Sequence, residues 1–410
     1  MPTASDALPA FTPVPYTAWY RVWERTTPAD FYYEMIMLPF FVLALSIHFW
    51  GVRRNRSKAK KFVACTQPIL ESEFALVGFG NRVKEPTQTQ VSPSNLIEAS
   101  AKLTGEHVSK DLLKEKTKFE FESYATGRSN TAFVDIKIYL WKWYNPLMLS
   151  AEYLVGVFFP TFATSPERIE AISYAFDGQE SDFVAPPVPG SEELGKVRGA
   201  GNSSYDPFIF AVVNKMAMRK LRDERYDLSL TFTKDNAKLP GWATVMSESA
   251  EVTDTMLTSE LIKNIGLAED YFEYLIITDQ PIEKPTTVDE ARPKKRVHIC
   301  LRIPSDKDYA KVLPFFQTFI RLADYLPGAA KLRPEVSRKI KAARETEIAK
   351  LRKVAEKETE EERRQQMDKL KLDERNRKLK GLSPEEQKKF LEKEADKKRR
   401  KDGKKMTMKG

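Results

Sequence analysis

The most suggestive chemistry in this chain is a cluster of cations near its C-terminus. The stretch KKRRKDGKK contains Lys397, Lys398, Arg399, Arg400, Lys401, Lys404 and Lys405. Such a block can bind nucleic-acid phosphates by releasing counterions, or it can lie on anionic lipid. A solvated, disordered end is a third interpretation, and composition alone leaves all three open.

Catalytic and metal-binding residues are sparse in the rest of the chain. The cysteines and histidines are scattered as Cys65, Cys300, His48, His107 and His298. This spacing fits neither a disulfide framework nor a zinc site. The Gly-rich stretch LVGFG at residues 76–80 is followed by Val83 where a dinucleotide-binding loop needs a small residue. We therefore predict no enzyme activity, no cofactor and no metal.

The apolar run FYYEMIMLPFFVLALSIHFWGV at residues 31–52 is predicted to cross a membrane. About 20 residues at 1.5 Å each span a hydrocarbon core of roughly 30 Å. Glu34, Pro39 and His48 are unusual in such a run and are candidate contacts for a membrane partner. Glu34 and His48 also lie close enough to its ends to reach the interfaces. The alternative for the whole run is a buried core helix of a soluble domain.

The residues that flank this run predict its orientation. Residues 1–30 carry two basic side chains, whereas residues 53–61 carry six. Short flanks rich in Lys and Arg remain in the cytosol. We therefore expect residues 1–30 to be lumenal and residues 53–410 to be cytosolic. The run begins too late for a signal peptide and lacks a basic leading segment.

The basic character of the chain resides in its tail. Residues 331–410 hold 29 Lys and Arg against 17 Asp and Glu, a net charge of +12, while the whole chain carries +9. Residues 329–410 are rich in helix formers and poor in apolar side chains, so they are predicted to form long exposed helices rather than a core. Gly381 is expected to end the first helix, and Ser383-Pro384 to begin the second. The apolar heptads are interrupted, which favours a solvated helix over a stable coiled-coil dimer.

Residues 53–328 have ordinary globular composition and are predicted to form one α+β domain. Residues 118–125 and 131–140 alternate in polarity around a Thr-Gly-Arg turn, which predicts a β-hairpin. Other strands are predicted at 168–176, 271–278 and 296–303, a strand or helix followed by a basic helix at 208–225, and helices at 62–74, 146–159, 253–265 and 306–326. The apolar helix at 146–159 contains Glu152 and is too short for a second span.

Several stretches in this order are similar to the calumin family, the coiled-coil-containing endoplasmic reticulum membrane proteins of the PAT complex. They are the span with its basic exit, LESEFALVG at 70–78, FAV at 210–212, Leu239-Pro240, MSESAEVTD at 246–254, ITDQ at 277–280 and KKMTMK at 404–409. The resemblance extends over most of residues 31–410 and includes the terminal helix and tail. No single motif is diagnostic, but their order and spacing are specific.

The resemblance implies a non-enzymatic accessory factor of the multipass translocon. Its basic end would meet ribosomal RNA phosphate near the exit tunnel. With a small Asterix-like membrane partner, and beside a Sec61-type translocon, it would shelter nascent multipass clients. Animal members have a long acidic lumenal segment proposed to hold calcium, whereas residues 1–30 contain only three acidic residues. We therefore expect a fungal-type member without that segment. The alternatives are a membrane tether whose tail binds anionic lipid, or a calcium-homeostasis protein.

Overall fold

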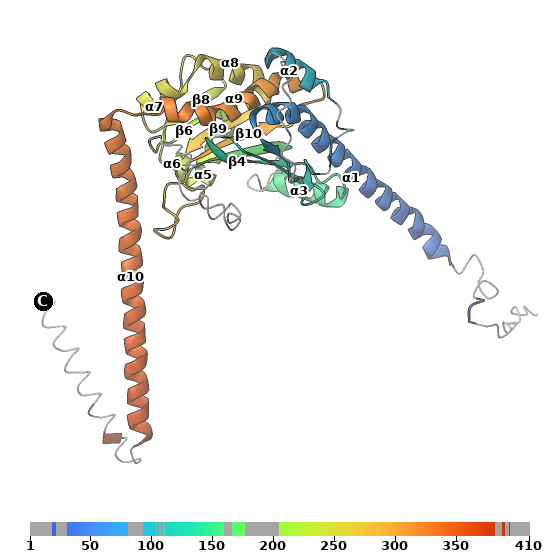
Figure 1. Cartoon of the computed structure of the whole chain (residues 1–410). Helices are drawn as coiled ribbons and strands as arrows, with labels where there is room; N and C mark the ends of the chain where they lie inside the picture. The colour runs from blue at the N-terminus through green and yellow to red at the C-terminus, as the bar shows by residue number, and fades with distance from the viewer. Residues whose placement is uncertain are drawn as a thin grey trace, which may run out of the picture. The chain divides into compact units, whose positions relative to one another are not determined.

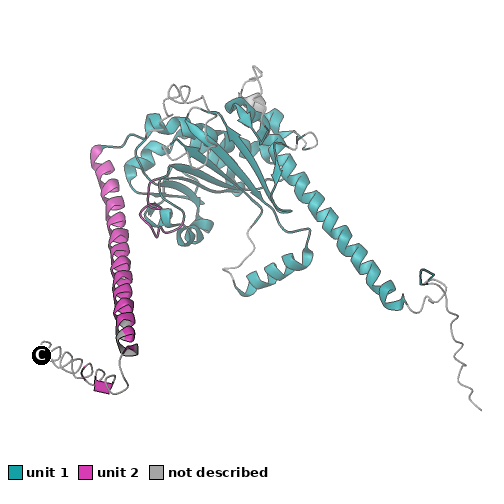
Figure 2. Ribbon diagram, turned by 60° about the horizontal axis from the view of Figure 1, so that its bottom comes forward, with its two compact units in different colours: residues 1–282, 294–333 teal, residues 283–293, 334–410 magenta. Residues whose placement is uncertain are grey.

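The computed structural model contains two compact units, which Figure 2 shows in different colours. The first comprises residues 1–282 and 294–333, and the second comprises residues 283–293 and 334–410. The structure describes residues 19–21, 31–80, 93–103, 105, 108–109, 111–128, 130–159, 166–176, 205–381, 388–389 and 393.

A ten-stranded antiparallel sheet forms the frame of the first unit (Figure 1). Its order is β1-β3-β4-β5-β10-β9-β6-β8-β7, and β2 also pairs with β3. The strands are β1 (Leu76–Val77), β2 (Lys114–Glu115), β3 (Glu120–Thr126), β4 (Thr131–Tyr139), β5 (Arg168–Ala175), β6 (Phe210–Asn214), β7 (Phe232–Lys234), β8 (Ala243–Ser247), β9 (Phe272–Thr278) and β10 (Arg296–Arg302). With the helices below, the sheet confirms the predicted α+β class.

The predicted hairpin is present as β3 and β4. Its register pairs Phe121 with Ile138 and Ala125 with Val134, and these four side chains are buried. Gly127 turns the chain at φ +98°, and a Cβ at that position would lie 2.6 Å from the Ala75 side chain. A glycine is therefore required at this turn both by its conformation and by the close approach.

The helices of the first unit are α1 (Tyr32–Glu73), α2 (Pro93–Ala101), α3 (Pro146–Phe158), α5 (Lys215–Glu224), α6 (Tyr226–Ser229), α7 (Ala250–Met256), α8 (Ser259–Ala268), the 3-10 helix η6 (Glu269–Tyr271) and α9 (Tyr309–Ala329). Figure 1 shows α2, α8, α9 and the second half of α1 on one face of the sheet, with α5 and α6 on the other. The main core lies between the sheet and the helices α2, α8, α9 and the second half of α1. There the Phe62 ring of α1 meets the Phe316 ring of α9 edge to face at 6.1 Å. A smaller cluster around Ala211, Met246 and Ile276 packs against Met218 and Leu221 of α5.

Two details of the predicted helices differ from the structure. The helix predicted at 62–74 is the end of α1, which continues from the apolar run without a break. The single helix predicted at 253–265 is two helices, α7 and α8. Leu257 leaves helical geometry, and the Thr258 side chain caps α8 by accepting a hydrogen bond from the Leu261 N–H.

The second unit contains α10 (Pro334–Lys380), a helix of 47 residues. Its surface is exposed from Arg352 to Lys371, as expected for a helix of charged residues. The helix ends at Lys380, directly before Gly381, as predicted. The Gly381 N–H donates a hydrogen bond back to the Arg377 carbonyl. The second tail helix predicted from Ser383 falls outside the described residues, apart from isolated positions.

Candidate membrane-exit site

The first half of α1 is an apolar helix that the described protein leaves uncovered. Residues 32–46 are all exposed, and Gly51 and Val52 are the first buried residues of the helix. Among the described residues, α1 is the one helix long and apolar enough to cross a membrane. The predicted span is therefore present as a regular helix, which enters the folded domain at Gly51.

Glu34, Pro39 and His48 all lie on this part of α1. Glu34 and His48 are 14 residues apart, close to four helical turns, so they share one side of the helix about 21 Å apart along its axis. Pro39 lies on a different side. Glu34 and Pro39 are exposed, whereas the His48 ring meets the Tyr144 ring edge to face at 5.7 Å. The structure therefore does not bring the three residues into one site, and it places His48 at the edge of the domain.

Three of the six cations in the basic exit of α1 form ion pairs with the domain. Arg56 pairs with Glu115 at 2.7 Å, Lys58 with Glu167 at 2.6 Å and Lys61 with Asp306 at 2.8 Å. Partial burial would raise the pKa of Glu115, but hydrogen bonds from Arg56 and Lys118 outweigh it and lower that pKa. These pairs attach successive turns of α1 to separate parts of the chain.

Four exit cations surround an open groove beside the end of the apolar run. Its lining residues are Phe49, Val52, Arg53, Arg56, Ser57, Lys60, Lys61, Gly105 and Asp306. Arg53 and Lys60 are exposed, and neither forms an ion pair within the part of the chain that the structure describes. Cations arranged in this way at the end of a membrane helix can hold an anionic headgroup.

Asn55 is a buried polar residue that attaches α1 to the domain, and the sequence alone did not indicate this role. It is fully buried in the middle of the basic run, and its side-chain amide donates to the carbonyls of Lys118 and Trp141, each at 3.0 Å. Gly51, Asn55 and Ala59 recur at every fourth position and form a stripe of small buried residues on α1. This spacing is the sequence signal for a close contact on this side of α1, since small residues allow another backbone to approach.

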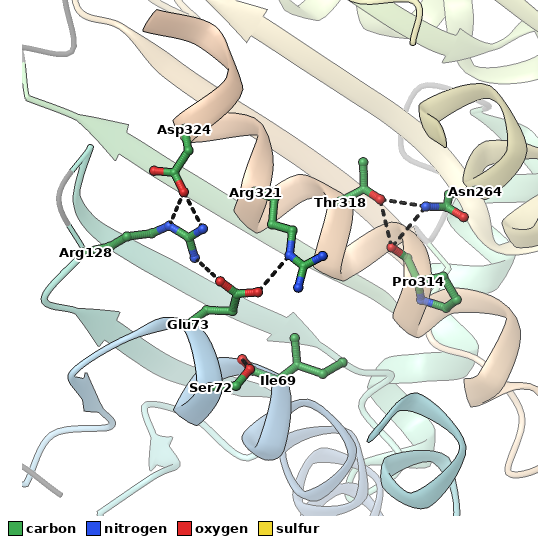
Figure 3. A network of polar contacts seen from close by, with 9 residues as sticks. All are labelled: Ile69, Ser72, Glu73, Arg128, Asn264, Pro314, Thr318, Arg321 and Asp324. Atoms are coloured by element: carbon green, nitrogen blue, oxygen red, sulfur yellow. Dashed lines mark hydrogen bonds and ion pairs between the residues drawn. The ribbon is translucent and has the colours of Figure 1, made fainter. Parts of the chain in front are cut away.

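The far end of α1 is held by the network of ion pairs in Figure 3. Glu73 accepts from Arg128 at 2.7 Å and from Arg321 at 2.8 Å, and Arg128 also donates to Asp324. Burial alone would lower the pKa of Arg128, but the bond to Asp324 and the charge of Glu73 raise it. The network connects α1, the hairpin turn and α9, so α1 is fixed to the domain at both ends of its buried half.

The buried His and Cys residues that the structure describes have pKa values shifted by their burial. Burial lowers the pKa of His298 well below its usual value, raises the pKa of Cys65 to about 11 and raises that of Cys300 as well. In the part of the chain that the structure describes, no group of three or more His, Cys, Asp or Glu side chains could hold a metal ion. These residues are accounted for as parts of the core.

The seven cations of the C-terminal cluster, Lys397 to Lys405, lie outside the described residues. The helix that precedes them, α10, has a length of roughly 70 Å at 1.5 Å per residue. It carries both charge signs along its exposed surface, with pairs such as Lys350 to Glu347 at 2.7 Å.

The chain is similar in sequence to known proteins along most of its length. An endoplasmic reticulum membrane protein of Schizosaccharomyces pombe is 26% identical over 391 residues, covering 92% of this chain and 87% of the relative. One of Saccharomyces cerevisiae is 26% identical over 264 residues, covering 62% and 63%. PAT complex subunit CCDC47 of Danio rerio is 27% identical over 140 residues, covering 30% and 29%. The family described as PAT complex subunit CCDC47 matches residues 30–401, so the chain belongs to that family.

Proposed function

We propose that this protein is a non-enzymatic subunit of an endoplasmic reticulum membrane complex that assists the insertion and folding of multipass membrane proteins. The observation that carries the proposal is the family match over residues 30–401, which includes the apolar helix, the domain and most of the tail. The two fungal relatives are described as endoplasmic reticulum membrane proteins, and the Danio rerio relative as a PAT complex subunit.

The proposed topology has a single span, a lumenal N-terminus and a cytosolic C-terminus. The six cations of residues 53–61 support it, because a basic flank of a span remains in the cytosol. The sequon at Asn202 supplies a test. In microsomes we expect no glycan at Asn202, whereas a glycan there would place the domain in the lumen and contradict the proposal.

Ribosome binding is assigned to the C-terminal cluster, Lys397 to Lys405. Seven cations within nine residues can neutralise several phosphates of ribosomal RNA and release their counterions. The preceding α10, at 47 residues, supplies a long charged helix between the cluster and the domain.

The membrane partners would be an Asterix-like small protein, a Sec61-type translocon and nascent multipass clients. Glu34 is the best supported partner contact of the three span residues, because it is an exposed carboxylate on a helix that the domain leaves uncovered. His48 already contacts Tyr144, so only part of its surface is available. A photocrosslinker at position 34 should capture a small membrane protein in native membranes, and capture of lipid alone would contradict this contact.

Co-sedimentation with ribosomes tests the tail. The variant replaces all seven cluster cations with Gln. The matched control replaces seven exposed cations of α10, namely Lys353, Lys357, Arg363, Arg364, Lys369, Lys371 and Arg377, so that both variants lose equal charge. If each cluster cation meets one phosphate, the slope of log affinity against log salt should fall by about 5 to 6 in the first variant. The control should change the slope much less.

Two outcomes would contradict the ribosome assignment. One is unchanged ribosome binding after loss of the cluster. The other is equal binding of the tail to ribosomes and to anionic vesicles, which would favour the alternative of a membrane tether whose tail binds anionic lipid. Crosslinking from ribosome-bound membranes, with this protein as bait, should recover ribosomal RNA and nascent multipass chains if the translocon proposal holds.

A further inference from the structure

The short helix α3 (Pro146–Phe158) has an apolar surface that the fold does not use. None of its residues is buried, and its one charged side chain is Glu152. Leu147 is 80% exposed and Phe158 is 76% exposed. The exposed large apolar side chains of this region are Trp141, Leu147, Met148, Tyr153, Leu154, Val155, Val157, Phe158 and Phe159. A contiguous apolar surface of this kind indicates an interaction site.

The contact of α3 with the rest of the described chain is a narrow stripe. Leu149, Glu152 and Gly156 are half-buried, and they recur at helical spacing on one side. Glu152 pairs with Lys142 just before the helix, so its charge is compensated. The remaining sides of α3 are exposed and predominantly apolar. A helix that is apolar nearly all round is typical of a protein core or of a membrane, and the described residues supply no core around it.

The start of α3 lies directly against the end of the apolar half of α1. The Trp143 ring meets the Trp50 ring edge to face at 6.3 Å, and the Tyr144 ring meets His48 at 5.7 Å. A Cβ on Gly51 would lie only 2.4 Å from the Tyr144 backbone nitrogen. The segment that leads into α3 is therefore level with residues 48–51, where α1 passes from its exposed apolar half into the domain. Figure 1 shows α3 beside α1 on the side of the sheet away from α9.

The side chains at this level suit a lipid–water boundary. The Arg54 guanidinium lies over the Trp143 ring at 4.4 Å and the Trp50 ring at 5.2 Å from the ring centres. Trp and Tyr side chains concentrate at headgroup depth, and Arg can reach lipid phosphates from there. At 13 residues α3 is about 20 Å long, too short to cross a core of roughly 30 Å but sufficient to lie along its surface.

We propose that α3 is an interfacial membrane helix, with its exposed apolar side chains among the acyl chains of the leaflet that borders the folded domain. The inference rests on α1 crossing the membrane. Lipid is the expected occupant, because the segment leading into α3 contacts the end of the apolar run at His48 and Trp50 and brings with it the aromatic and cationic side chains of a headgroup layer. The protein would then contact its membrane through both α1 and α3, and this would fix the orientation of the domain relative to the membrane.

Fluorescence quenching on the full chain in phosphatidylcholine–phosphatidylserine vesicles tests this placement. A polarity-sensitive probe is attached to a single cysteine introduced at Leu154 or Phe158, which contribute nothing to the core. The native thiols, Cys65 and Cys300, are buried, and the pKa of each is raised, so they resist labelling. Phe41 in the exposed half of α1 is the positive control, and Met216, 90% exposed on α5, is the aqueous control.

Lipids that carry a nitroxide on the acyl chain should quench Leu154 and Phe158 nearly as strongly as Phe41, and should leave Met216 bright. Iodide should show the reverse order. Iodide quenching at Leu154 equal to that at Met216 would overturn the inference. Shielding of Leu154 from both quenchers would also overturn it, since protein would then cover α3. Loss of lipid quenching at Phe41 would instead contradict both the membrane span of α1 and the membrane contact of α3. Failure of the α3 proposal alone is therefore distinguishable from failure of the span.

Discussion

α9 and α3 are both apolar helices of the same unit, but the domain covers only one of them. α9 buries twelve of its 21 residues between α1, α8 and the sheet, although it contains Lys311, Arg321 and Asp324. α3 contains one charged residue and buries none. The helix with more charge is therefore the one in the core. A helix that packs on a protein core needs one apolar stripe and can keep a polar face in water. A helix that is apolar on most sides needs an apolar environment, such as lipid, around those sides.

Truncation of one large side chain in each helix should show the greatest difference. Phe316 of α9 is fully buried against Phe62 and Phe319. Phe316→Ala should lower the free energy of unfolding by about 3–5 kcal/mol, because it leaves a cavity. Leu154→Ala in α3 should change it by less than about 0.5 kcal/mol. Chemical denaturation of the detergent-solubilised protein measures both, and a comparable loss from the two variants would end the distinction between the helices.

The attachment of α3 to α1 can be broken at Gly51. A Cβ there would meet backbone atoms of Trp143 and Tyr144 at 2.4–2.6 Å, and backbone cannot rotate away as a side chain can. Gly51→Ala should therefore cost about 1–3 kcal/mol of unfolding free energy. It should also displace α3 relative to the membrane. The matched control is Gly266→Ala in α8, where nothing lies within 4 Å.

The control should be neutral, or stabilising by up to about 1 kcal/mol, because alanine is the better helix former. If Gly51→Ala behaves in the same way as Gly266→Ala, the segment that leads into α3 is not held against α1 as the structure places it.

The core and α3 should also respond differently to pH. Burial, together with the charges of Arg225 and Arg296, lowers the pKa of His298 well below 6.5. Below about pH 6.5 the unfolded chain gains a proton that the folded chain does not bind, so stability falls as pH falls, by at most about 1.4 kcal/mol per pH unit. His298→Gln should remove this component between pH 6.5 and 5. An unchanged slope in the variant would show that His298 accepts the proton in the folded state.

Lipid quenching at Leu154 should stay constant over the same pH range. Acyl-chain contact does not depend on the protonation of a residue in the sheet. A parallel decline of quenching and stability would instead mean that α3 leaves the membrane as the core weakens.

Local patterns predicted much of this molecule, and non-local contacts account for most of what they missed. The apolar run, the hairpin at Gly127 and the helix that ends before Gly381 each depend on neighbours in sequence. The roles of Asn55 and Arg128 do not depend on neighbours in sequence, because their hydrogen-bond partners lie 55 to 196 residues away. The order of the sheet was unpredictable for the same reason. The helix at 146–159 was predicted as an element, but its lack of cover depends on what packs around it in three dimensions.

The ion pair between Glu152 of α3 and Lys142 can distinguish lipid from water around the helix, because its two variants should behave differently. Lys142 and Glu152 are each about a quarter exposed, so breaking their pair should cost less than about 1 kcal/mol of stability in either variant. In the membrane the two variants should differ. Glu152→Gln leaves Lys142, which can extend to the headgroups, whereas Lys142→Ala leaves an uncompensated carboxylate beside acyl chains. Lipid quenching at Leu154 should therefore decrease in Lys142→Ala and persist in Glu152→Gln, while equal quenching in both would place Glu152 in water.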